Sequence, residues 1–132
     1  MKLDHVGIAV EDLEAAGRLY EALGLACSGR EEVEEQKVEV AFYPLGETRL
    51  ELLQSTDPEG PIGKFIARKG AGLHHLCVEV PDVAVALERL AVEGFELIDR
   101  VPRKGAGGCK VAFVHPKSTG GVLLELSEKP RK

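Results

Sequence analysis

The chain has 132 residues, of which 44% are hydrophobic and 30% charged, so it is long enough for a hydrophobic core and too apolar for disorder. Its formal net charge of -5, with no cluster of Lys and Arg, argues against a nucleic-acid partner, and no apolar run approaches a membrane span. The odd number of cysteines, the lack of a CxxC motif and a charged N-terminus favour a reducing cytoplasm over secretion.

The first predicted elements are a strand followed by a helix. Residues 5–10 alternate and are rich in β-branched side chains, which is typical of a strand. Asp12 is suited to cap a helix, because apolar residues then recur at helical spacing and Gly24 stands where helices commonly end. Further strands are predicted at 38–43 and 49–53, with a weaker one before them.

The second half of the chain repeats this pattern. His75 follows His5 by 70 residues, and the same offset relates Asp82 to Asp12 and Gly94 to Gly24. Later strands are again predicted, at 110–114 and 122–126. Each half therefore predicts the element order βαβββ.

We expect an α+β fold with two βαβββ modules in tandem, forming a curved mixed sheet around a metal site. Module one covers residues 1–56, a linker with a short helix covers 57–72, and module two covers 73–129. Because neither half is long enough to bury a good core alone, we expect the modules to pack as one domain over 1–132.

Each predicted module supplies one histidine and one glutamate to the same face of the sheet. His5 and Glu51 lie opposite their apolar neighbours, because alternate side chains of a strand share a face. His75 and Glu125 hold the matching positions of the second module. Two imidazoles and two carboxylates suit a borderline divalent ion and leave positions open for a substrate. His74 breaks the register, so we predict a packing or supporting role for it.

Several segments of the chain carry a family resemblance that extends over nearly its whole length. Gly-Leu-His-His at 72–75 and His-Pro-Lys-Ser at 115–118 are specific in combination. The other matching segments are Gln36 and residues 3–10, 45–46, 50–53, 102–106 and 120–126. The pattern resembles the vicinal oxygen chelate superfamily, which has the glyoxalase-like fold, and within it the methylmalonyl-CoA epimerase family.

The resemblance implies a metal-dependent isomerase with His5, Glu51, His75 and Glu125 as ligands. The expected ion is Co²⁺, with Mn²⁺, Ni²⁺ and Zn²⁺ as alternatives, and the expected assembly is a homodimer. The implied reaction interconverts (2R)- and (2S)-methylmalonyl-CoA by exchange of the C2 proton through a metal-stabilised enolate. Glu125 is the better candidate for proton transfer, and Glu51 is the second.

Two departures and one loop qualify this expectation. Some family members carry Gln where Glu51 stands, and a second carboxylate should lower the Lewis acidity of the ion if nothing compensates. Some relatives have Glu at the strand position of Val40, so the second base is not assigned. The loop that follows residue 114 offers His115, Lys117 and Ser118 as contacts for the substrate's carboxylate or the phosphates of CoA.

Two other functions remain open on the same scaffold. One is an isomerase of the lactoylglutathione lyase type, which also uses four ligands. The other is a metal-free small-molecule-binding resistance protein, although such binders need aromatic walls and this chain has 5% aromatic residues and no Trp. An extradiol dioxygenase is less favoured, because its iron has three protein ligands and Glu51 would be a fourth.

Overall fold

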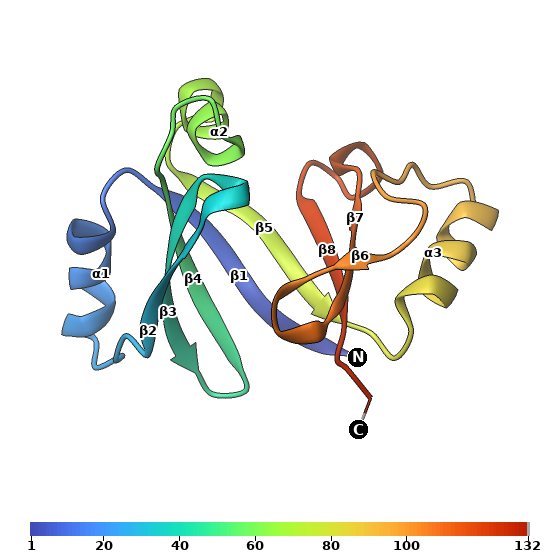
Figure 1. Cartoon of the computed structure of the whole chain (residues 1–132), viewed down its shortest axis with the longest axis horizontal. Helices are drawn as coiled ribbons and strands as arrows, with labels where there is room; N and C mark the ends of the chain where they lie inside the picture. Colours follow the sequence, from blue (N-terminus) through green and yellow to red (C-terminus); the bar gives the residue numbers. More distant parts are fainter. Residues whose placement is uncertain (132) are drawn as a thin grey trace. The chain divides into compact units, whose positions relative to one another are not determined.

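The computed structural model describes residues 1–131, which form two compact units (Figure 1). The first unit is His5–His74, and the second combines Met1–Asp4 with the described residues from His75 onward. The linker helix thus belongs to the first unit, whereas the first four residues belong to the second. Within the described residues, every helix is too short or too polar to cross a membrane.

The first unit contains a four-stranded mixed sheet in the order β2-β3-β4-β1. Strand β1 runs parallel to β4, and the other neighbours are antiparallel. Its elements in chain order are β1 (Lys2–Val10), α1 (Leu13–Ala22), β2 (Gly29–Val33), the 3-10 turn η1 (Glu34–Gln36), β3 (Val38–Leu45), β4 (Thr48–Ser55) and α2 (Pro61–Lys69). Only the part of β1 from His5 onward belongs to this unit. The predicted βαβββ order is confirmed here.

The two faces of this sheet bury different clusters. Helix α1 packs on the face that carries Val10, Ala41 and Leu52. Helix α2 packs on the opposite face through Ile62, against residues such as Leu53. The alternation of the strands therefore places the face of Glu51 on the side of α2, two residues before a buried leucine.

The second unit repeats the arrangement with the strand order β5-β8-β7-β6. Helix α3 packs on one face of this sheet, where Val83 and Leu87 meet Ala112, Val114 and Leu126. Its elements are β5 (Gly72–Glu79, from His75 onward), α3 (Val83–Val92), β6 (Arg103–Lys104), the turns η2 (Ala106–Gly108) and η3 (Pro116–Ser118), β7 (Lys110–Val114) and β8 (Leu123–Glu128). Strand β6 is the weak strand expected before β7.

Side chains at the strand ends fix both helix starts. The predicted cap at Asp12 is confirmed, since its carboxylate accepts from the N–H groups of Glu14 and Ala15. Asp82 caps the second helix in the same way, by accepting from the N–H of Val85. A second acceptor comes from the last strand of each unit. The N–H of Leu13 donates to Gln54 Oε1 at 2.8 Å, and the N–H of Val83 donates to Glu128 Oε1 at 2.9 Å.

Candidate functional site

The first unit places the predicted ligands His5 and Glu51 beside each other. His5 lies on β1 and Glu51 on β4, and the parallel register pairs Gly7 with Glu51. His5 Nδ1 is 3.4 Å from Glu51 Oε2, and only 7% and 8% of the two residues are exposed. Polar groups buried to this extent require partners, which is a usual property of a binding site.

Arg49 is a third member of this group, and the sequence interpretation did not include it. Its Nε donates to Glu51 Oε2 at 2.7 Å, its Nη2 lies 2.7 Å from the same oxygen, and Nη2 is 3.4 Å from His5 Nδ1. The signal for it was available, because residues two apart on a strand share a face and Arg49 precedes Glu51 by two.

The second unit places His75 and Glu125 together in the same way. His75 lies on β5 and Glu125 on β8, and the parallel register pairs Cys77 with Glu125. His75 Nε2 is 3.6 Å from Glu125 Oε1. His75 is 8% exposed, and the side chain of Glu125 is 14% exposed. The pairing within each unit agrees with the prediction from the repeat.

The donor atoms of each pair fit a divalent ion. Two ligand atoms about 2.1 Å from one ion stand roughly 3.0–3.4 Å apart in octahedral or tetrahedral geometry. The observed nitrogen-to-oxygen separations of 3.4 and 3.6 Å are close to this spacing and long for a hydrogen bond. Imidazole and carboxylate are also ligands that borderline divalent ions accept. Each pair therefore supplies two suitable ligands.

The predicted substrate contacts lie in and beside the turn η3. His115 Nδ1 accepts the N–H of Lys117 at 3.0 Å, and Ser118 Oγ accepts the N–H of Glu96 at 2.7 Å. His115 and Ser118 therefore shape the loop, and the side chain of Lys117 is exposed. Their role toward a substrate stays a prediction.

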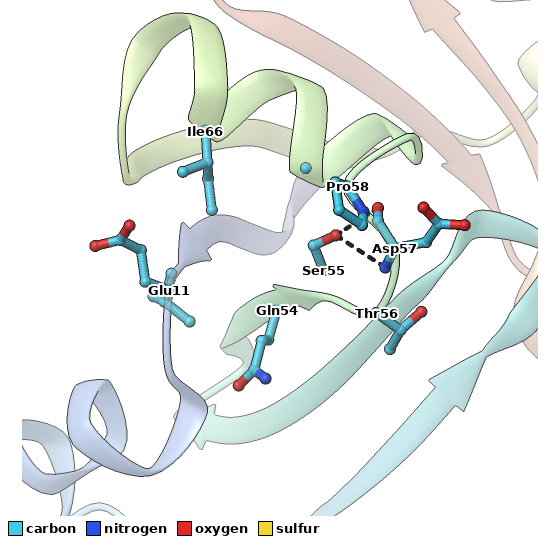
Figure 2. Close-up of a pocket in the computed structure, with 9 residues that line it drawn as sticks. Glu11, Gln54, Ser55, Thr56, Asp57, Pro58 and Ile66 are labelled. Carbon is cyan, nitrogen blue, oxygen red and sulfur yellow. Dashed lines mark hydrogen bonds between the residues drawn. The ribbon is translucent and has the colours of Figure 1, made fainter.

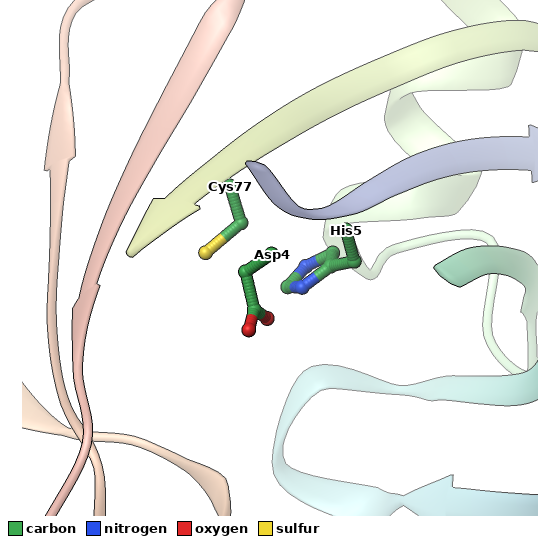
Figure 3. Close-up of side chains that lie close together, drawn as sticks. All are labelled: Asp4, His5 and Cys77. Atoms are coloured by element: carbon green, nitrogen blue, oxygen red, sulfur yellow. The ribbon is translucent and has the colours of Figure 1, made fainter. Parts of the chain in front are cut away.

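His74 and Asp4, which each precede a proposed metal ligand in the sequence, have packing and ion-pair roles. The ring of His74 meets the ring of Phe65 edge-on at 4.8 Å, and burial lowers the pKa of His74. Asp4 and Cys77, both in the second unit, bring an oxygen and the sulfur within 4.8 Å of each other (Figure 3, which also draws His5, the next residue of β1). Asp4 also lies 3.6 Å from Lys129 Nζ, so it forms an ion pair with the C-terminal segment.

A cavity of about 340 Å³ lies in the first unit, where β1 and β4 end and α2 begins (Figure 2). Its polar side chains form hydrogen bonds with nearby groups. Ser55 Oγ donates to the carbonyl of Asp57, and Gln54 Oε1 accepts the N–H of Leu13 at the start of α1. The Asp57 carboxylate accepts the N–H of Glu59, which lowers the pKa of Asp57. These bonds shape the connection to α2 and do not point to a ligand.

Comparison with known proteins then places the chain. Residues 4–113 match the model of the Glyoxalase/Bleomycin resistance protein/Dioxygenase superfamily. The chain belongs to this superfamily. The vicinal oxygen chelate resemblance and its fold are thereby confirmed.

Relatives within the superfamily are named as epimerases. The chain is 39% identical to human mitochondrial methylmalonyl-CoA epimerase over 96% of its own length and 73% of that protein. A solved methylmalonyl-CoA epimerase in complex with methylmalonyl-CoA and NH4+ has a TM-score of 0.87 and 33% identity, covering 97% of this chain and 94% of that one. An uncharacterised Bacillus subtilis protein, YqjC, is 45% identical over 96% of this chain and 91% of its own length. Methylmalonyl-CoA epimerases are isomerases.

Proposed function

We propose that the chain epimerises methylmalonyl-CoA at C2, with one divalent ion held by His5, Glu51, His75 and Glu125. The observation that carries this proposal is the imidazole–carboxylate pair at the matching position of each unit, with both imidazoles buried. The relatives named as methylmalonyl-CoA epimerases support the choice of substrate.

The reaction requires removal and return of a proton on carbon. The C2 proton lies between a thioester carbonyl and a carboxylate, so its loss delivers negative charge to oxygen. A bound divalent ion would supply Lewis-acid stabilisation of that charge. We assign the exchange of the C2 proton to Glu125. His5 and His75 would hold and orient the metal ion as its two imidazole ligands. Exposed Lys117 would offer a point charge to the substrate's carboxylate or to the phosphates of CoA.

Isotope exchange tests this function directly. We expect the C2 proton signal of (2S)-methylmalonyl-CoA to disappear in D2O when the protein and Co²⁺ are present, and a chelator to stop the loss. His75→Ala should abolish the exchange, and the hemithioacetal of glutathione and methylglyoxal, the test compound for the alternative isomerase, should give no product. Absence of exchange with Co²⁺, Mn²⁺, Ni²⁺ and Zn²⁺ alike would refute the proposal.

Ion stoichiometry tests the shared ligand set independently of turnover. Calorimetric titration with Co²⁺, the metal we propose, should give one ion per chain. His5→Ala and His75→Ala should each weaken that single event. Two ions per chain, each lost by one substitution only, would show that the pairs bind separately.

Two further properties are also proposals. We propose a homodimer, which light scattering coupled to size exclusion would measure; a monomer mass at micromolar concentration would contradict it. The cytoplasmic location expected from the sequence also stays a prediction, and cell fractionation would test it.

A further inference from the structure

We propose that Arg49 is a positioning residue that compensates the charge of Glu51, so that this carboxylate acts toward a metal ion as a nearly neutral ligand. The inference rests on the proposed function for its ligand set. It goes further by assigning a role to a residue outside that set. It also answers how the chain accommodates a carboxylate where some relatives have an amide.

The contacts of Arg49 are those of a strong ion pair. Both Nε and Nη2 lie 2.7 Å from Oε2 of Glu51, which is the distance of a charge-assisted hydrogen bond. Glu51 is 8% exposed, whereas the side chain of Arg49 is 35% exposed. The carboxylate therefore lies where water screens it poorly, and the guanidinium of Arg49 is a source of positive charge in direct contact with it.

The guanidinium is held in place by the strands. Arg49 and Glu51 share a face of β4, and Phe42 stands opposite Glu51 in the antiparallel ladder with β3. The guanidinium carbon of Arg49 lies 5.9 Å from the centroid of the Phe42 ring, which is within the range of a cation–π contact. Arg49 is thus fixed by an aromatic face as well as by its ion pair.

The second unit shows the same arginine-on-phenylalanine arrangement with a different carboxylate. Phe113 stands opposite Glu125, and Arg103 lies over the Phe113 ring at 5.2 Å. Arg103 Nε, however, pairs with Asp99 Oδ1 at 3.1 Å. The two arginines come from different strands, Arg49 from β4 and Arg103 from β6, and they pair differently: Arg49 with a proposed ligand and Arg103 with a loop aspartate.

The consequence is a more positive ligand set. Two uncompensated carboxylates would cancel both charges of a divalent ion and weaken its pull on substrate oxygens. A divalent ion, its two carboxylate ligands and the guanidinium of Arg49 together would carry about one net positive charge. We expect a site that holds its ion less tightly than a two-carboxylate set would, and that attracts an anionic substrate better.

A double-mutant cycle on Co²⁺ affinity, measured without substrate by competition with a chelating dye, tests the inference. Removing the cation in Arg49→Met should tighten binding about tenfold or more, because an ion and a guanidinium that share one carboxylate repel each other. Arg49→Lys keeps the charge and should stay within about threefold of wild type. Glu51→Gln should weaken binding about tenfold, and the double substitution R49M/E51Q should stay within about threefold of Glu51→Gln alone, because Arg49 acts on the ion through that carboxylate. Additive effects would instead return the double substitution to wild-type affinity.

Controls separate this role from a structural one. Arg103→Met removes the arginine that lies over Phe113 in the second unit and should leave Co²⁺ affinity within about twofold of wild type. Circular dichroism and thermal unfolding of every variant should show a fold like that of wild type. In the exchange assay, Arg49→Met should lower kcat about tenfold, and R49M/E51Q should recover most of it.

Opposite outcomes overturn the inference. Weaker Co²⁺ binding by Arg49→Met would show that Arg49 only holds the rotamer of Glu51. Purely additive effects in the cycle would show no coupling between the two charges. If wild type binds Co²⁺ with the expected cycle but exchanges no C2 proton, the proposed function fails and the role of Arg49 stands.

Discussion

Glu128 offers a quantitative test of how the repeat stabilises its second helix. The residue is 6% exposed, and its Oε1 accepts the N–H of fully buried Val83 at the start of α3. Hydrogen bonds to charged groups contribute roughly 1.5–3 kcal/mol, and a carboxylate near a helix N-terminus adds about 0.3–1 kcal/mol. Glu128→Ala leaves a buried N–H without this acceptor, so we expect the free energy of unfolding to fall by about 2–3 kcal/mol.

Glu128→Gln separates the hydrogen bond from the charge. Gln54 already performs this role in the first unit, so an amide oxygen can satisfy the helix start. We expect this variant to lose only about 0.5–1.5 kcal/mol. For a chain of this size the alanine variant should unfold roughly 6–12 °C lower, and exposed Glu88→Ala, the control on α3, should change stability by less than about 0.5 kcal/mol. Urea unfolding measures all three. A loss below about 0.5 kcal/mol for Glu128→Ala, or equal losses for Gln and Ala, would refute the reasoning.

Three other outcomes follow from the first unit and from metal binding. Burial, and then the Glu21 carboxylate that accepts its hydrogen bond, raise the pKa of Tyr43 to about 12. The folded chain therefore holds this proton more tightly than the unfolded chain, and the resulting stability is complete below pH 10 and lost as the pH rises toward 12. Urea unfolding between these pH values should show a steeper loss of unfolding free energy for wild type than for Tyr43→Phe. An equal pH dependence of the two proteins would contradict this. Gly17→Ala should lower the free energy of unfolding by about 1–3 kcal/mol, although alanine favours helices, because the added Cβ would collide with the Tyr43 hydroxyl. Adding Tyr43→Phe should recover part of this loss. A Gly17→Ala variant more stable than wild type would be the contrary result. Co²⁺ at 100 times its dissociation constant should raise the free energy of unfolding by about 2.7 kcal/mol, and an unchanged melting temperature would contradict metal binding.

Periodicity and the repeat were enough to predict most of the fold. The alternation around His5, the cap at Asp12 and the glycine after each helix depend on local chemistry, and these features recur 70 residues later. The weak strands were expected but not bounded, because β6 has only two residues and little apolar pattern. The assignment of residues 1–4 to the second unit depends on long-range packing, which local patterns do not contain.

The candidate site was predicted in part. Each His–Glu pair followed from strand alternation plus the repeat, and each pair is adjacent in its unit. Arg49 was overlooked because an arginine beside a turn is commonly a solvated residue, although its spacing from Glu51 indicates a shared face. The contrast with Arg103 was not accessible from the sequence, since it depends on where the segment containing Asp99 places a carboxylate.

The loop around η3 has a consequence for the entropy of ligand binding. The N–H of Gly121 donates to the carbonyl of Pro116 at 2.8 Å, and the hydroxyl of Thr119 lies between the carbonyls of Pro116 and Val122. With Ser118 held by Glu96, the backbone of this loop is ordered by its own hydrogen bonds. A ligand that meets the loop does not need to immobilise it, so contact energy made there is not offset by the cost of ordering backbone. A preformed loop of this kind favours discrimination by shape over adaptation to many ligands.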